Sequence, residues 1–205
     1  MDVNVLITFF DKEDHLPYLL QILNSYKILK PTVLQVYTGT NPDVKANLKY
    51  NLPTNALDQR EYSMLVEGAK AFKSVNQTKR FLKLNSNTWP LDEQKIVDIF
   101  NKLDELERPV ATNYWTNNQP GSFAADIFLA DTRFGNVFAP ANKFLRTTEL
   151  TLHSVIQNLS HQPYLIEERE PVHWRNLWEC KNLKWVMYND LQQNLNRANE
   201  FLTGQ

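Results

Sequence analysis

The sequence contains little cysteine, no signal-like N-terminus and no long apolar run. Cys180 is the only cysteine among 205 residues, so an internal disulfide is excluded and a reducing compartment is the simpler expectation. No apolar stretch approaches the roughly 20 residues that a membrane-spanning helix needs, and the first residues lack the basic segment of a signal peptide. We therefore expect a cytoplasmic protein without a membrane span.

Glycine and surplus charge are also scarce. Only five glycines occur, and no glycine-rich phosphate loop of the Walker or dinucleotide-binding type can be found. The 22 basic and 23 acidic residues give a net charge of −1, which is not the electrostatic footprint of a nucleic-acid-binding protein. We expect no nucleic-acid partner.

What is present is the composition and patterning of a globular α/β chain. Hydrophobic residues make up 42% and charged residues 22%, which are ordinary values for one domain spanning residues 1–205. A β-branched apolar run at 3–10, a leucine-patterned segment at 14–26 and a second apolar run at 32–38 predict a strand, a helix and a parallel strand. Further patterns predict helices over 56–73, 91–106, 148–159 and 189–202, and strands over 80–84 and 110–115.

The second half of the chain has a different sequence pattern. Residues 122–130 and 136–139 flank a turn-like segment, which predicts an antiparallel pair of strands. An extended piece is expected over 163–167. Alternating strands and helices followed by antiparallel strands predict an α/β fold with a mixed central sheet flanked by helices.

Four strings in this order resemble the inverting nucleotide-sugar glycosyltransferases of the GT-A fold. They are VNVLITFFDKEDHLPYLLQILNSY, VLQVYTGTNPD, KRFLKLNSNTWPLDEQKI and TELTLHSVIQNLSHQPYLIEEREPVHW, and the similarity of order covers most of the chain. The resemblance implies a nucleotide-binding half over 1–115 and an acceptor-side half over 116–205. It also implies transfer of a sugar from a nucleotide-diphosphate sugar to a hydroxyl of a glycan or another acceptor.

The same resemblance implies a metal site, with departures from the family. Its D-x-D carboxylates hold Mn²⁺ or Mg²⁺ against the leaving diphosphate, but this chain has Asn85 and Asn87 at those positions. His173 matches a late histidine that touches metal or diphosphate in some members. Thr38 replaces an aspartate near the nucleotide, and Glu149 keeps one carboxylate of an acidic pair.

Other candidates come from their places along the chain. Asp126 lies in an apolar strand, where a charge needs a reason, and with Glu149 it forms the predicted catalytic pair. Residues at or just after strand ends can contact a ligand there. The substrate-binding candidates are Thr8, Phe9, Thr38, Trp89, Tyr114 and Trp115.

Each candidate also has a structural alternative. Asparagines before Pro90 are common turn residues, Glu149 suits a helix start through the helix dipole, and any single aromatic is by default a core residue. His15, His153 and His161 are expected at the surface. Two other readings of the whole chain stay open: a catalytically inactive glycosyltransferase-like binding protein, and an unrelated α/β protein without a nucleotide site.

Overall fold

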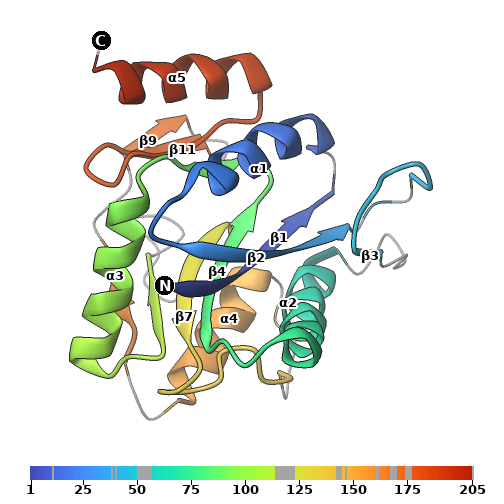
Figure 1. Ribbon diagram of the computed structural model, residues 1–205. Helices are drawn as coiled ribbons and strands as arrows, with labels where there is room; N and C mark the ends of the chain where they lie inside the picture. Colours follow the sequence, from blue (N-terminus) through green and yellow to red (C-terminus); the bar gives the residue numbers. More distant parts are fainter. Residues whose placement is uncertain are drawn as a thin grey trace.

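The chain folds around a seven-stranded mixed sheet in the order β3-β2-β1-β4-β7-β6-β8 (Figure 1). This computed structural model describes residues 1–10, 12–37, 39, 41–49, 57–113, 123–141, 145, 147–159, 162–166, 170–173 and 177–204, without the side chains of 57–60, 170–173 and 177. The strands are β1 (Asp2–Phe9), β2 (Lys30–Tyr37), β3 (Leu48–Lys49), β4 (Arg80–Asn85), β6 (Val110–Thr112), β7 (Ile127–Asp131) and β8 (Tyr164–Leu165).

Strand β1 lies near the middle of this sheet, with β2 and β4 as parallel neighbours on its two sides. Strand β7 runs antiparallel between β4 and β6. The mixed sheet and the parallel pairing of the first two strands confirm the predicted fold class. Residues from both predicted halves share this one sheet, and the assignment of 1–115 to the nucleotide and 116–205 to the acceptor stays a prediction.

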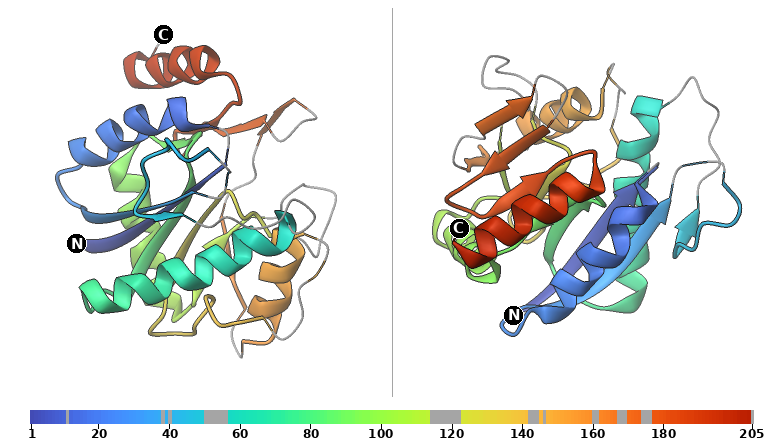
Figure 2. Two further views of the ribbon diagram at one scale, coloured as in Figure 1. Left: turned by 90° about the vertical axis from the view of Figure 1, so that its right-hand side faces the viewer. Right: turned by 90° about the horizontal axis from the view of Figure 1, so that it is seen from above.

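Helices cover both faces of the sheet. Helices α2 (Leu57–Val75) and α4 (Thr148–Gln157) lie on one face, and α1 (Leu16–Ser25) and α3 (Glu93–Leu106) lie on the other (Figures 1 and 2). A short 3-10 helix (Glu13–His15) precedes α1. Side-chain caps explain several helix starts, because Asp92 accepts a hydrogen bond from the amide of Gln94 and Thr147 accepts one from the amide of Leu150.

A second sheet of four strands packs on the α1 and α3 side, in the order β5-β11-β10-β9. It consists of β5 (Thr88–Pro90), β9 (Glu170–His173), β10 (Leu177–Cys180) and β11 (Trp185–Met187). The C-terminal helix α5 (Leu191–Thr203) lies over it, held in part by two hydrogen bonds of 2.6 and 2.7 Å from Arg197 to the buried carboxylate of Glu179 (Figure 2).

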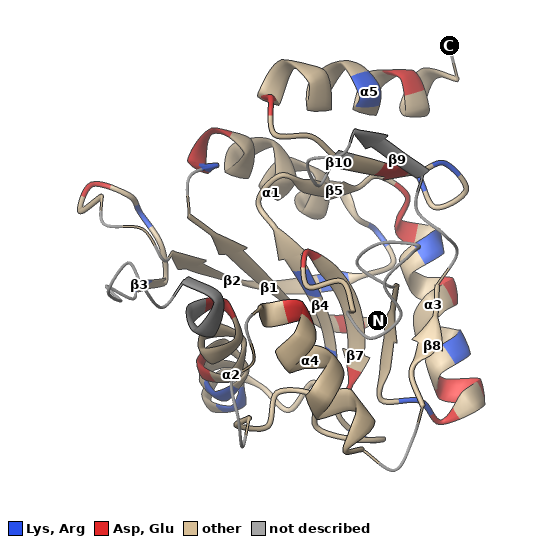
Figure 3. Ribbon diagram, turned by 180° about the vertical axis from the view of Figure 1, so that it is seen from behind, with Lys and Arg blue, Asp and Glu red and all other residues tan. Residues whose placement is uncertain are grey.

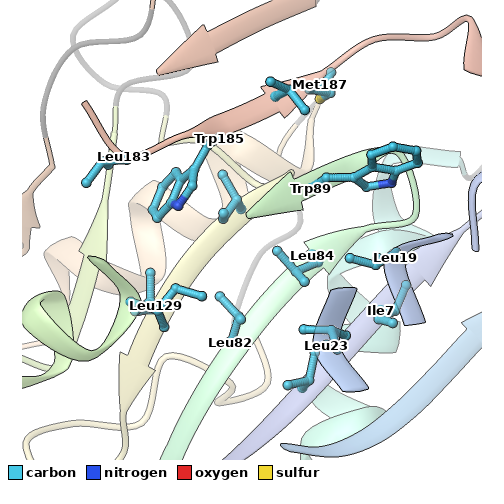
Figure 4. Packing of buried hydrophobic residues seen from close by; sticks show 14 of the residues in the cluster. Ile7, Leu19, Leu23, Leu82, Leu84, Trp89, Leu129, Leu183, Trp185 and Met187 are labelled. Carbon is cyan, nitrogen blue, oxygen red and sulfur yellow. The ribbon is translucent and has the colours of Figure 1, made fainter. Parts of the chain in front are cut away.

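Alternation along β1 and β4 separates two apolar cores. Val5, Ile7 and Leu84 face α1, α3 and the second sheet, whereas Leu6 and Phe81 face α2 and α4. Figure 4 shows the first core, in which aliphatic side chains of the large sheet face two tryptophans of the second sheet. This period of two also decides which face each polar residue of a strand occupies.

One predicted strand pair is wrong. Residues 136–139 form a turn in which the amide of Ala139 donates to the carbonyl of Asn136, and β7 pairs with β4 and β6 instead. Val137 and Phe138 are buried under α2, and the hydroxyl of Tyr62 lies 3.1 Å from the carbonyl of Val137 and 2.8 Å from that of Ala139, between which its one proton is shared. The apolar pattern therefore reflected burial of a loop and not a strand.

Helix α2 approaches β1 closely at Gly68, and this contact gives a test of the packing. A methyl group at Gly68 would lie 2.5 Å from Cδ1 of Leu6, which is fully buried. We expect Gly68→Ala to lower the free energy of unfolding by about 1 kcal/mol, because overpacking exceeds the gain in helix propensity. Urea denaturation measures the change. Leu6→Val should relieve it, so that Gly68→Ala costs less in that background; an equal cost in both backgrounds would contradict this account.

Candidate functional site

The candidate site lies where β1 and β4 end. The chain leaves β1 toward β2 on one side, whereas β4 lies on its other side, so the strand order reverses between β1 and β4. In α/β sheets, ligands bind outside the carboxyl ends of strands at such a point. Thr8 of β1 and Asn85 of β4 are neighbours in the register at this end, and both belong to the α2 and α4 face of the sheet by alternation.

A buried lysine organises the side chains at this place. The ammonium of Lys83 donates to Oε1 of Glu61 at 2.6 Å, to Oδ1 of Asn85 at 2.5 Å and to the carbonyl of Ala125. The Lys83 side chain is 0% exposed and that of Glu61 is 27% exposed. An ammonium has three protons, so all three are used, and the buried charge is paired as burial requires.

Thr8 completes this arrangement. Its hydroxyl lies 3.0 Å from Oδ1 of Asn85 and 3.2 Å from Oε1 of Glu61. A hydroxyl has one proton to donate, so it is shared or alternates between these two acceptors. We call the four side chains Thr8, Glu61, Lys83 and Asn85 the lysine cluster.

Asp126 lies beside the lysine cluster, just before β7. Its backbone carbonyl accepts a hydrogen bond of 2.9 Å from the backbone N–H of Asn85. Its carboxylate accepts one of 2.5 Å from the indole N–H of Trp178 in β10. Asp126 is 8% exposed. The second sheet therefore reaches the site through Trp178 and positions one of the two predicted catalytic carboxylates.

Glu149 lies in the first turn of α4, and Figure 3 shows acidic residues in red at the start of this helix. Burial raises the pKa of its carboxyl group, and the negative charges of Glu61 and then Asp126 raise it further, against hydrogen bonds from its own amide and from Thr147. The negative charges of Glu61 and Asp126 thus both act on the carboxyl group of Glu149, the other member of the predicted pair. A carboxyl group with a raised pKa is a typical general acid or base.

Other predicted site residues lie elsewhere. The amide group of Asn87 donates to the carbonyl of Tyr188 and to Oδ1 of Asn189, at 3.2 and 3.3 Å, under α5. Trp89 is 1% exposed in the core (Figure 4). Phe9 packs on the ring of Tyr37, on the opposite face of the sheet from Thr8. Thr38, Tyr114, Trp115 and the side chain of His173 lie outside the described residues.

Histidine 15 corrects another expectation. It is 0% exposed and therefore does not lie at the surface. Its Nε2 lies 3.3 Å from the carbonyl oxygen of Asn189, and its Nδ1 lies 3.3 Å from the side-chain amide nitrogen of Asn194. Burial lowers its pKa. These partners come from the loop before α5 and from α5 itself, so we infer that His15 helps to position the C-terminal helix.

The described donor set does not fit the implied Mn²⁺ or Mg²⁺. Oδ1 of Asn85 already accepts from Lys83 and Thr8, and Asn87 does not share its site. Within the described ranges, no group of three or more His, Cys, Asp or Glu side chains is placed to hold a metal ion. Hard divalent cations prefer several carboxylate oxygens, so the cofactor stays a prediction without support from these residues.

Two members of the lysine cluster carried sequence signals that the predicted site did not use. Lys83 interrupts the apolar strand RFLKLN, and a charge in a buried strand needs a partner. Glu61 precedes Leu65, Gly68 and Phe72 at helical spacing, on the buried stripe of α2. A charged residue on the buried face of a helix indicates that it has a polar partner in the interior.

No family model matches the chain, and no curated protein matches it by sequence. Among solved structures, the chain is similar to a glycosyltransferase involved in the glycosylation of the major capsid of PBCV-1, with a TM-score of 0.55 and 15% identity, covering 98% of this chain and 100% of that one. Another similar structure is A197 from STIV, with a TM-score of 0.48 and 14% identity, covering 93% and 95%.

The likeness to the PBCV-1 enzyme agrees with the mixed seven-stranded sheet and its flanking helices, and the chain has a GT-A-like fold. At 15% identity the likeness shows the fold alone. Among the described residues, no helix is long and apolar enough to cross a membrane.

Proposed function

We propose that the chain is a glycosyltransferase that moves a sugar from a nucleotide-diphosphate sugar to an acceptor hydroxyl. The observation that carries this proposal is the buried lysine cluster beside Asp126 and Glu149, at the switch point of a GT-A-like sheet. Two carboxylates with different surroundings suit different tasks. One carboxylate is tied to an indole N–H, and the other has a raised pKa.

In this proposal Glu149 is the general base. Its carboxylate takes the proton of the acceptor hydroxyl while the hydroxyl oxygen bonds to the anomeric carbon and the bond from that carbon to the diphosphate oxygen breaks. The electron pair of the broken bond leaves with the diphosphate. Asp126, held by Trp178, accepts hydrogen bonds from hydroxyl groups of the donor sugar.

An exposed aromatic ring supplies a surface for the nucleotide base. Phe10 follows β1 directly and is 48% exposed, unlike the buried candidates Phe9 and Trp89. We expect Phe10→Ala to weaken binding of a nucleoside diphosphate about tenfold, because stacking on a base contributes about 1 to 3 kcal/mol. Calorimetry measures the affinity. Leu202→Ala changes a 61% exposed side chain on the remote helix α5 and should leave the affinity unchanged. Equal effects of the two variants would show that Phe10 does not contact the nucleotide.

The proposed function is tested with a panel of nucleotide sugars, each with and without Mn²⁺. Release of the nucleoside diphosphate measures turnover, and calorimetry measures binding. Transfer or hydrolysis of any donor supports it. Binding without turnover would favour the second candidate, an inactive binding protein, which the amides at Asn85 and Asn87 in place of carboxylates also favour. No binding and no turnover in either condition would overturn both.

A further inference from the structure

The orientation of the Asn85 side chain is determined by its neighbours. Its amide oxygen lies 2.5 Å from the ammonium of Lys83 and 3.0 Å from the hydroxyl of Thr8. The lysine can only donate and has no lone pair, so the amide nitrogen cannot take this place. The NH₂ group of Asn85 must therefore face away from the lysine cluster, and no described residue accepts a hydrogen bond from it.

We infer that Asn85 acts as a hydrogen-bond donor to an oxygen of the nucleotide sugar, and that no divalent cation takes part at this position. The inference rests on the proposed function and specifies how its donor is held. At the strand end where the resembling family has a metal-binding carboxylate, this chain presents N–H groups. The recognised chemistry is an oxygen acceptor, which is either a diphosphate oxygen or a sugar hydroxyl.

The lysine cluster itself disfavours a cation here. The Asn85 oxygen accepts a proton from Lys83 and shares that of Thr8 with Glu61. The fully buried ammonium next to it repels a second positive charge. Glu61 already pairs with that ammonium, and the carboxylate of Asp126 already accepts from Trp178. A metal ion at this position would have to displace Lys83 from the oxygens to which it donates.

Lys83 is a positioning residue in this account. It touches no position that a substrate can reach, because its side chain is 0% exposed and its three protons bind protein oxygens. Its effect on the ligand passes through Asn85, whose amide it orients. A carboxylate at position 85 would satisfy Lys83 and Thr8 equally well but would present no N–H group outward.

The test compares calorimetric binding of uridine and guanosine diphosphates and of their glucose and mannose esters, in EDTA and in Mn²⁺. For the wild type we expect equal affinity in both conditions. Asn85→Asp and Asn85→Ala should each weaken binding in EDTA about tenfold or more, the effect of losing one hydrogen bond. Asn101→Asp, on the exposed side of α3, adds the same charge at a remote place and should bind as the wild type does.

The outcomes separate this inference from the proposed function. Weaker binding of both the diphosphates and the sugar esters places the contact on a phosphate oxygen, whereas weaker binding of the esters alone places it on a sugar hydroxyl. Wild-type binding that is lost in EDTA and restored by Mn²⁺, or unchanged binding by both Asn85 variants, would overturn the inference while leaving the proposed function intact. If no probe binds the wild type, the proposed function fails and this inference fails with it.

Discussion

Replacing Lys83 with methionine is expected to lower the free energy of unfolding by about 3 kcal/mol. Methionine fills a similar volume but leaves the Glu61 carboxylate, the Asn85 oxygen and the Ala125 carbonyl without their shared donor. Breaking a buried ion pair by removing one partner costs about 3 to 5 kcal/mol, and we take the lower value because the Glu61 side chain is 27% exposed. Thermal unfolding should shift downward by about 6 to 12 °C.

A matched control separates the buried pair from a surface pair. Lys102 bonds Glu105 at 2.9 Å on α3, with both side chains well exposed. Lys102→Met removes the same charge from a pair with the same kind of partner, and should change stability by less than about 0.5 kcal/mol. Adding Glu61→Gln to Lys83→Met should recover part of the loss, because the remaining partner is then neutral. A loss of similar size in the two lysine variants would show that the lysine cluster contributes little to folding.

Replacing Glu149 with glutamine is expected to lower the rate of sugar transfer about 10²- to 10⁴-fold, the usual contribution of a general base. Rate measurements across pH make the test specific. The pKa of Glu149 is raised by burial and by the charges of Glu61 and Asp126, so the wild-type rate should rise with pH as this carboxyl group loses its proton. The glutamine variant should lack that rise. A profile of unchanged shape in the variant would assign the base to another group.

The same variant is expected to be more stable than the wild type above the ordinary glutamate pKa. Because the folded state raises the pKa of Glu149, the wild type loses stability as pH increases from the ordinary value through the raised one. Glutamine carries no charge to desolvate. Its advantage should appear in neutral and alkaline solution and vanish in acid, where both side chains are neutral. Glu105→Gln, at a 66% exposed side chain, should show no such pH-dependent gain.

If replacing Glu149 stabilises the fold and slows the reaction, the residue serves the reaction and not stability. The structural alternative for Glu149, a favourable charge at a helix start, predicts the reverse, because the neutral variant would then be less stable. Thermal unfolding curves of the purified variant at several pH values therefore distinguish the two interpretations even before a donor sugar is known.

Local sequence patterns were sufficient for most helices and for the first strands. Leu16, Leu19 and Leu23 recur on one face of α1 and are all buried, and the apolar run of β1 is buried nearly throughout. These elements are predictable because periodicity of three to four or of two residues is visible within a single segment. The same local view predicted a strand over 136–139, since an apolar loop and a buried strand have the same short pattern.

The predicted site was partly assembled by the structure and partly dispersed. Asn85, Thr8 and Asp126 meet at one end of the sheet, and the charge of Asp126 acts on Glu149. Their roles stay predictions. Asn87, only two residues beyond Asn85, turns to partners more than 100 residues away in the chain. No local pattern determines which way a side chain in a turn will face, because its partners come from a distant segment.

The sequence by itself determined the alternating strands and helices and the strand ends at which polar residues gather, because these depend on neighbours within a few residues. Only the tertiary structure decided that Lys83 meets Glu61, that Trp178 reaches Asp126, and that Trp89 belongs to the core between two sheets. Those contacts join separate elements. The physical reason is that hydrogen bonds and burial depend on where separate elements pack in space, and no single segment carries that information.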